Sequence, residues 1–273
     1  MTIASIESRQ VNTRPAVRLR TATSLGAPLF GVAVMIALWW AAGLLLEANP
    51  RFIAFRGFTV DQTFAAFGQL LASGDAWRAT VPSLSRVGQG LGWAFLIGAP
   101  VGLALGSWVM LERTLQLPFQ ILRMVSPLAW MPIAVLMFAT WDGSIVFLIA
   151  AAAIWPIVFA TAAGVKRIDP VWLAMARNLG GRTLPVLRAI VVPAVAQDIL
   201  TGLRLALGVA WIVLVPAEFL GVTSGLGYAI NDARDTLSYD RLAALVVLIG
   251  LIGYVLDALI SAAIRRAHWT PTT

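Results

Sequence analysis

The 273-residue sequence contains no cysteine and one histidine, His268, and only 12% of its residues are charged. Without cysteine the chain can form no disulfide, and it offers neither a thiolate metal site nor a cysteine nucleophile. A single histidine near the C-terminus excludes a histidine-rich metal centre. Soluble domains carry about 25% charged residues, so this chain lacks the polar surface that a soluble fold needs. The composition therefore predicts one polytopic membrane domain.

Hydrophobic residues make up 59% of the chain, and they gather into six stretches. Each stretch is long enough for a helix that crosses about 30 Å of hydrocarbon. We therefore expect an all-α membrane protein with about six transmembrane helices. The stretches cover residues 25–46, 87–111, 124–141, 143–165, 199–222 and 242–264.

The arginines and lysines predict the orientation, because cytoplasmic loops carry an excess of both. Thirteen basic residues fall on one side of the six stretches and six on the other, so we expect both termini in the cytoplasm. Tails at 1–24 and 265–273 would then flank a transmembrane domain over 25–264. The thirteen are Arg9, Arg14, Arg18, Arg20, Arg113, Arg123, Lys166, Arg167, Arg177, Arg182, Arg188, Arg265 and Arg266; the six are Arg51, Arg56, Arg78, Arg86, Arg234 and Arg241.

The net charge of +7 does not indicate a nucleic-acid partner. A nucleic-acid surface gathers its basic residues into a patch or stripe. Here they are scattered at the ends of the apolar stretches, as expected of a membrane protein with basic inner loops.

The connection over 47–86 is longer than a turn and predicts a short amphipathic helix on the outer surface. Its apolar positions have the spacing of one helical face. They are Phe64, Phe67, Leu70 and Leu71.

Glycines recur at a spacing of four in the second apolar stretch. This spacing allows two membrane helices to approach closely, and it favours packing over a pore. The pairs are Gly88 with Gly92, and Gly98 with Gly102.

The connection over 166–197 predicts a helix–turn–helix on the cytoplasmic side. A helix over 171–179 is followed by the Gly180–Gly181 break, and a second helix over 183–192 is expected to end at Pro193. Such an element between two spans offers a surface that a partner protein can bind.

This segment resembles the coupling-loop signature of bacterial binding-protein-dependent permeases. The family signature reads Glu-Ala-Ala, three residues, Gly, nine residues, then Ile-x-Leu-Pro. Gly180, Ile190 and Pro193 fall at the required spacing, and Ala176 matches the second alanine. The chain departs from the signature in two places: Ala174 stands where the family has glutamate, and Met175 where it has the first alanine.

Further fragments resemble the nitrate, sulfonate and taurine branch of that family. Their order and spacing over Ser83 to Arg266 make the resemblance specific, although each fragment is short. They are Ser83-Leu84-Ser85-Arg86-Val87, Pro127-Leu128-Ala129-Trp130-Met131-Pro132, Gly202-Leu203-Arg204-Leu205-Ala206-Leu207-Gly208, and Glu218 followed by Gly225-Leu226-Gly227-Tyr228.

The resemblance implies a permease with the type I ABC importer fold, multi-pass in the bacterial plasma (inner) membrane. Two copies, expected as a homodimer in membrane lipid, would form the pathway for a small anion. Separate ABC ATPase subunits would grip the inner loops, and a periplasmic or lipid-anchored solute-binding protein would deliver the cargo. The implied ATPase-coupling residues are Ala174, Met175, Ala176, Arg177, Gly180, Ile190 and Pro193.

The chain has no Gly-x-x-x-x-Gly-Lys-Ser/Thr loop to hold phosphates, so ATP–Mg is expected on the partner subunits. We expect no catalytic residue, no metal and no cofactor on this chain. An intramembrane enzyme would need a catalytic histidine, a Ser/Lys dyad or paired carboxylates in its spans, which the sequence lacks. Two alternatives stay open: a permease of the same family for bicarbonate or a pyrimidine precursor, and a non-transporting assembly or sensor protein.

Prolines and isolated charges mark candidate pathway or gating residues. A proline removes one backbone hydrogen bond and tends to kink a helix, and Pro100, Pro156 and Pro216 are expected to interrupt spans as well. A charge within a span usually faces a partner or a cavity. Arg204 and Asp257 could form an ion pair that fixes the fifth stretch to the sixth, or they could lie in direct contact with an anionic substrate. The candidates are Pro127, Trp130, Pro132, Arg204, Glu218 and Asp257.

Overall fold

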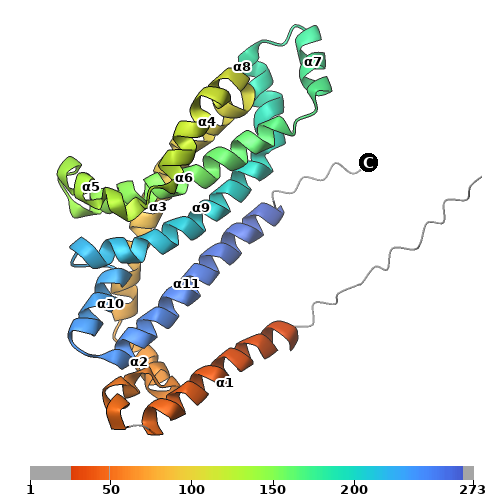
Figure 1. Ribbon diagram of the computed structural model, residues 1–273. Coiled ribbons are helices and arrows are strands. Elements are labelled where there is room, and N and C mark those ends of the chain that lie inside the picture. Colours follow the sequence, from red (N-terminus) through yellow and green to blue (C-terminus); the bar gives the residue numbers. More distant parts are fainter. Residues whose placement is uncertain (1–25, 49, 267–273) are drawn as a thin grey trace, which may run out of the picture.

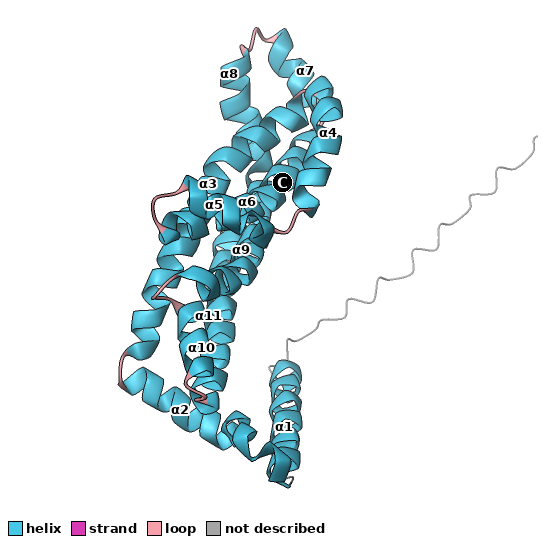
Figure 2. Cartoon of the chain, turned by 60° about the vertical axis from the view of Figure 1, so that its left-hand side comes forward, coloured by secondary structure: helices cyan, strands magenta, loops and turns pink. Residues whose placement is uncertain are grey.

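The structure, a computed structural model, describes residues 26–48 and 50–266, and over these residues the chain is helical (Figures 1 and 2). The tail expected over 1–24, His268 and most of the tail expected over 265–273 lie outside the described residues. The helices are α1 (Gly26–Ala48), η1 (Pro50–Phe58), α2 (Val60–Ala72), α3 (Asp75–Ser107), α4 (Val109–Met124), η2 (Pro127–Trp130), α5 (Met131–Met137), α6 (Trp141–Lys166), α7 (Pro170–Asn178), α8 (Thr183–Val186), η3 (Leu187–Val191), α9 (Val192–Gly221), α10 (Leu226–Asp235) and α11 (Tyr239–Arg266).

Five helices in the described ranges are long and apolar enough to cross a membrane, and the bent pair of α4 with η2–α5 makes a sixth if it counts as one span. The expected six spans therefore agree with the structure in number. α7 and α8 lie at one end of the bundle and α2 at the other (Figure 1). We call these the α7–α8 end and the α2 end.

The core forms where α6 packs between α3 and α9. α6 is apolar on all sides, as expected for a helix buried by neighbours. Contact with α3 is close because small residues of α3 face α6 at a spacing of four. A Cβ added at Gly102 would lie 2.6 Å from both the Thr161 Cβ and the Val158 carbonyl oxygen. This row is Gly90, Ala94, Gly98, Gly102 and Gly106.

The expected glycine contacts are thus half correct. Gly98 and Gly102 face α6, but a Cβ at Gly88 or Gly92 would meet open space. The four-residue spacing was right and the choice of helix face was wrong for the first pair.

The third apolar stretch, expected as one helix over 124–141, is wrong. α4 ends at Met124, and the axis of η2–α5 is bent from it by 88°. Val125 and Ser126 have extended backbones, with ψ of 126° and 128°. A residue before proline avoids the helical region, so Pro127 forces the break.

The prolines do not all interrupt helices as expected. Pro127 and Pro132 occupy the first turns of η2 and α5, where a missing N–H costs nothing. Pro100, Pro156 and Pro216 lie inside helices that continue past them. Each removes one hydrogen bond, and the packed neighbours hold the rest of the helix in place.

Pro193 does not end a helix either. It sits in the first turn of α9, and the π-helix η3 runs directly into it. The Val192 N–H donates to the Leu187 carbonyl, a wide turn of π type. Leu187–Gly221 is therefore one continuous rod.

α2 confirms the amphipathic helix expected in the first long connection, but its buried face is rotated. Thr63, Ala66 and Leu70 are buried against α11, whereas Phe64 and Leu71 are exposed. Apolar spacing alone could not decide between these overlapping faces.

α1 stands apart from the other long helices in both views (Figures 1 and 2). Gly43 is its buried residue, and Trp39 Nε1 donates to the Phe58 carbonyl at 2.8 Å. Its contacts within the described chain are with η1 and α2.

Candidate functional site

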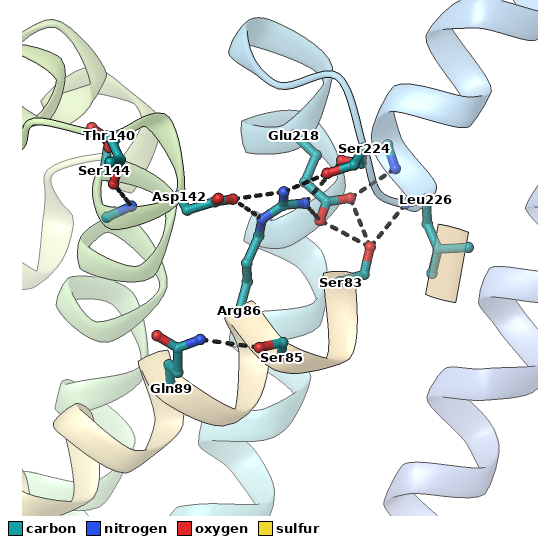
Figure 3. Close-up of polar contacts among 12 residues, drawn as sticks. Ser83, Ser85, Arg86, Gln89, Thr140, Asp142, Ser144, Glu218, Ser224 and Leu226 are labelled. Atoms are coloured by element: carbon teal, nitrogen blue, oxygen red, sulfur yellow. Dashed lines mark hydrogen bonds and ion pairs between the residues drawn. The ribbon is translucent and has the colours of Figure 1, made fainter. Parts of the chain in front are cut away.

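A polar network joins four helices near the N-terminus of α6 and the C-terminus of α9 (Figure 3). At its centre is Arg86 of α3, whose side chain is only 5% exposed. Its Nη1 donates to Glu218 Oε1 of α9 at 2.5 Å, and its Nε and Nη2 each lie 2.6 Å from Asp142 Oδ1 of α6. Ser224 accepts from the same guanidinium through its carbonyl and its hydroxyl, both at 2.9 Å.

Glu218 is fully buried and is held from three sides. Besides Arg86, it accepts from Ser83 Oγ at 2.8 and 2.9 Å and from the Gly227 N–H at 2.9 Å. Ser83 Oγ in turn accepts from the Leu226 N–H at 2.8 Å, at the start of α10. Oε1 thus accepts from Arg86 and Oε2 from the Gly227 N–H, and the two oxygens share the single proton of the Ser83 hydroxyl.

The glycines around Glu218 are required by close approach. Gly225 has φ of 111°, and a Cβ there would lie 2.5 Å from the Glu218 carboxylate. Only glycine adopts this backbone region without strain while leaving room for the side chain. The Gly225-Leu226-Gly227 run therefore places backbone donors against a buried acid.

The network carries two carboxylates and one guanidinium. Asp142 is 66% exposed and remains in contact with water, whereas Glu218 depends on Arg86 for its neutralising charge. A buried ion pair needs additional hydrogen bonds to offset desolvation, and Ser83, Ser224 and Gly227 provide them.

Sequence reasoning singled out Glu218 but missed its partners. Arg86 was assigned to an outer connection, because the apolar stretch begins only at residue 87. The helix α3 itself begins 12 residues earlier, at Asp75. The Ser83–Val87 fragment was a signal that these residues belong together. No spacing rule links Arg86 to an acid 132 positions away.

Arg204 of α9 and Asp257 of α11 form a bidentate pair. Arg204 Nε and Nη2 donate to the two Asp257 carboxylate oxygens, both at 2.7 Å. Both side chains are about half exposed, so the pair lies on the surface of the single chain and joins two long helices.

A cavity of about 700 Å³ opens between α4, η2, α6 and α9, and we call it the Arg123 cavity. Arg123, in the last turn of α4, is the one charged residue among the fifteen described residues that line it. Its guanidinium carbon lies 5.2 Å from the Phe159 ring centroid. Pro127 and Trp130 line the same cavity, whereas Pro132 does not.

Arg123 was expected in an inner loop, and this is wrong. α4 starts near the α7–α8 end and runs toward the middle of the bundle (Figure 1), and Arg123 lies in its last turn with its guanidinium beside Phe159 of α6. The expectation failed because the segment read as a loop after residue 111 is helix α4, whose charged residues hide it from a search for long apolar stretches.

The connection over 166–197, which resembles the coupling-loop signature and which we call the coupling segment, projects at the α7–α8 end (Figure 1). Gly180 has φ of 77°, a left-handed conformation that glycine adopts freely. The Gly181 N–H donates to the Ala176 carbonyl at 2.9 Å and closes the end of α7. Ala174 is exposed and Ala176 half-buried, while Ile190 lies in η3 and Pro193 in the first turn of α9.

Apolar side chains of this segment are open to solvent in the single chain. Trp172 and Met175 are more than half exposed and Leu179 is 86% exposed. Leu173 and Leu187 pack inward against the core and anchor the segment. Ion pairs from Lys166 to Glu112 and from Arg167 to Asp198 tie the end of α6 to α4 and α9; they also place charge beside this surface.

The six pathway candidates do not form one site. Pro127 and Trp130 meet at the Arg123 cavity, Arg204 and Asp257 meet on the surface of α9 and α11, and Glu218 belongs to the polar network. Within 26–48 and 50–266, no group of three or more histidine, aspartate or glutamate side chains could hold a metal ion.

Comparison with known proteins identifies relatives over most of the chain. Residues 94–268 match the family described as binding-protein-dependent transport system inner membrane component. The taurine transport system permease protein TauC of Escherichia coli is 30% identical over 262 residues, covering 96% of this chain and 94% of that protein. The bicarbonate transport system permease protein CmpB of Synechococcus elongatus is 37% identical over 193 residues, covering 70% and 69%. The nitrate import permease protein NrtB of Leptolyngbya laminosa is 34% identical over 206 residues, covering 76% and 70%.

A solved structure shares the fold. A chain of the MetNI methionine ABC transporter, in an inward-facing structure, superposes with a TM-score of 0.57 at 16% identity. The match covers 68% of this chain and 93% of that chain. Together with the helical architecture, it confirms the expected fold class.

Proposed function

This chain belongs to the family of binding-protein-dependent transport system inner membrane components, the permeases of ABC importers, and from that premise we propose that it forms the translocation pathway for a small oxyanion. Its relatives are named for taurine, nitrate and bicarbonate. These cargoes differ in size but share a negatively charged oxygen group. We therefore infer a cargo of that class: nitrate, a sulfonate such as taurine, or bicarbonate.

The observation that carries the proposal is the coupling segment. Gly180 falls at the family's glycine position, and the segment leads through η3 into α9 without a break. The exposed Trp172, Met175 and Leu179 need a partner to cover them. Separate ATPase subunits, which bind ATP–Mg, are that partner, and this chain itself has no catalytic role.

The other partners are proposed from the family to which the chain belongs. Two copies of this permease form the pathway in the plasma membrane, and a periplasmic or lipid-anchored solute-binding protein docks at the α2 end. The basic residues near the α7–α8 end favour the cytoplasm for that end and for both termini.

Substitutions on the coupling segment test the proposal. Met175→Asp and Leu179→Asp put a charge on the surface that the ATPase subunit would bury. Burial of one such side chain contributes about 1.5–3 kcal/mol, so each change should weaken ATPase retention about ten- to a hundredfold. The measurement is co-purification of the ATPase subunit together with uptake by the reconstituted complex.

Leu237→Asp is the matched control, because Leu237 is an exposed leucine in the turn between α10 and α11, away from the coupling segment. It should retain the ATPase subunit as the wild type does. Unchanged retention in both coupling variants would contradict the proposal.

The cargo is tested separately in a deletion strain supplied with nitrate, taurine, an alkanesulfonate or bicarbonate. Loss of uptake of one of these anions supports the proposed class. Normal uptake of all four, beside lost uptake of an uncharged solute, would refute it.

A further inference from the structure

The geometry points to Arg123 as an anion-binding group inside the pathway, where the Arg123 cavity takes a small organic oxyanion in transit. The ligand class is a compact sulfonate or carboxylate with an apolar body. This inference rests on the proposed transport function and adds to it a site and a residue.

Charge pairing sets Arg123 apart from Arg86 and Arg204. Two arginines within other spanning helices are held by carboxylates: Arg86 by Glu218 and Asp142, and Arg204 by Asp257. Arg123 has no carboxylate within 4.0 Å among the described residues, and the contact seen is with the Phe159 ring. A charge within a span that lacks a protein partner, and that borders a cavity, is set to bind a mobile counter-ion.

The N–H donors of Arg123 are available to an anion. The Arg123 guanidinium carbon lies over the Phe159 ring, and no acceptor among the described residues takes a hydrogen bond from its N–H groups. The N–H donors point outward in the guanidinium plane, and this fork matches two oxygens of a carboxylate or sulfonate. The aromatic ring therefore positions the charge without using its hydrogen bonds.

The wall of the Arg123 cavity favours an anion that has an apolar portion. Apart from Arg123, the lining is apolar, with Trp130, Phe147, Trp155 and Phe159 as its aromatic members. A bare inorganic anion would lose its hydration here and recover only the guanidinium contact. An anion with a methylene or ring portion buries that portion against the aromatics while its charged end pairs with Arg123. The volume of about 700 Å³ is ample for such a molecule.

The main experiment compares Arg123→Lys with Arg123→Gln in the complete complex, reconstituted in proteoliposomes with its ATPase subunits and binding protein. The probes are labelled ethanesulfonate, nitrate and bicarbonate. Loss of one charged hydrogen-bonded contact should lower ethanesulfonate uptake in Arg123→Gln about ten- to a hundredfold. Arg123→Lys should keep a larger share of uptake, because it keeps the charge.

Arg113→Gln is the matched control: Arg113 is an exposed arginine on the same helix, outside the cavity lining. It should transport like the wild type. ATPase-subunit retention should be unchanged in all three variants, because α4 is not part of the coupling segment.

A second measurement separates charge from structure. The chain has no cysteine, so Arg123→Cys creates its single thiol. Aminoethyl methanethiosulfonate forms a mixed disulfide there, releases methanesulfinate and installs a positive charge, whereas sulfonatoethyl methanethiosulfonate installs a negative one of similar size. The first reagent should restore ethanesulfonate uptake and the second should not, with the wild-type complex as the reagent control.

The outcomes distinguish this inference from the proposed function. Wild-type complex that imports none of the anions would refute the proposed function. Three results would overturn the role of Arg123. The wild type could import an anion that Arg123→Gln imports equally well, both reagents could restore uptake alike, or neither reagent could reach the thiol of Arg123→Cys. Uptake of nitrate or bicarbonate without ethanesulfonate would overturn the assigned ligand class.

Discussion

The polar network predicts that Glu218→Gln is among the most destabilising single-atom changes in this chain. The amide has nearly the same shape as the acid but carries no charge, so the buried Arg86 guanidinium keeps only the exposed Asp142 as its counter-charge. Its NH₂ group also replaces one of the two oxygens that accept hydrogen bonds from Arg86, Ser83 and the Gly227 N–H. A donor then faces a donor at that position.

The magnitude follows from burial. Removing one partner of a buried ion pair costs about 3–5 kcal/mol when a charge is left uncompensated. Asp142 still compensates Arg86 after Glu218→Gln, so we expect a loss of about 1–3 kcal/mol, from the charged hydrogen bond that is lost and the buried donor that the amide leaves unsatisfied. Asp142→Asn removes the other carboxylate, but Asp142 is 66% exposed, so that change should cost only about 0–1 kcal/mol. The structure therefore predicts unequal effects for two acids on the same guanidinium.

A double-mutant cycle isolates the pair. Arg86→Met should be the more destabilising of the two, since it leaves the buried Glu218 carboxylate without a counter-charge, whereas Glu218→Leu leaves Arg86 paired with Asp142. Their combination should cost about 2–3 kcal/mol less than the sum of the two, because no unpaired charge remains. Ser83, Ser224 and Gly227 would still lose polar partners, so the double variant should not regain wild-type stability.

The assay is stepwise unfolding of the purified permease with SDS in mixed micelles, followed by far-UV circular dichroism. Transport is not needed, so the result does not depend on the cargo. The reasoning would be refuted if Glu218→Gln unfolded within 1 kcal/mol of the wild type, or if Asp142→Asn cost as much as Glu218→Gln.

Two further predictions concern packing and orientation. Gly102→Val should separate α3 from α6 and prevent stable folding, because a Cβ there would lie 2.6 Å from the Thr161 Cβ. Gly92→Val adds its side chain in open space and should fold normally. Equal thermal stability of the two purified variants would contradict the packing. A cysteine at Ser73, in the turn between α2 and α3, should react with an impermeant thiol reagent added to right-side-out vesicles, and one at Arg182, beside Gly180, should not. The reverse labelling pattern would invert the proposed orientation.

The sequence predicted the parts of the fold whose signal is local. The fourth stretch, expected over 143–165, is α6 at Trp141–Lys166, because uniform apolarity defines both ends of a buried spanning helix. The Gly180 break was predictable for a similar reason: glycine at this spacing allows the positive φ that the turn adopts.

The parts that failed depend on contacts between distant residues. Whether Gly90 or Gly92 faces α6 is decided by the rotation of α3, which hydropathy does not report. Arg86 and Arg123 look alike in the sequence, as arginines at the edges of apolar stretches. The first is surrounded by acids from α6 and α9 and the second stands against an aromatic ring, and only the folded chain separates these surroundings.

The continuity of η3 and α9 has a mechanical consequence. α9 comprises 30 residues, or about 45 Å of helix, and it begins beside the coupling segment and carries Glu218 in its last turn. A rigid rod of that length acts as a lever: a tilt of about 5° at one end displaces the other by about 4 Å. That displacement exceeds the span of a hydrogen bond, so a small rotation imposed at the α7–α8 end is large enough to open or close the contacts of Glu218 at the far end.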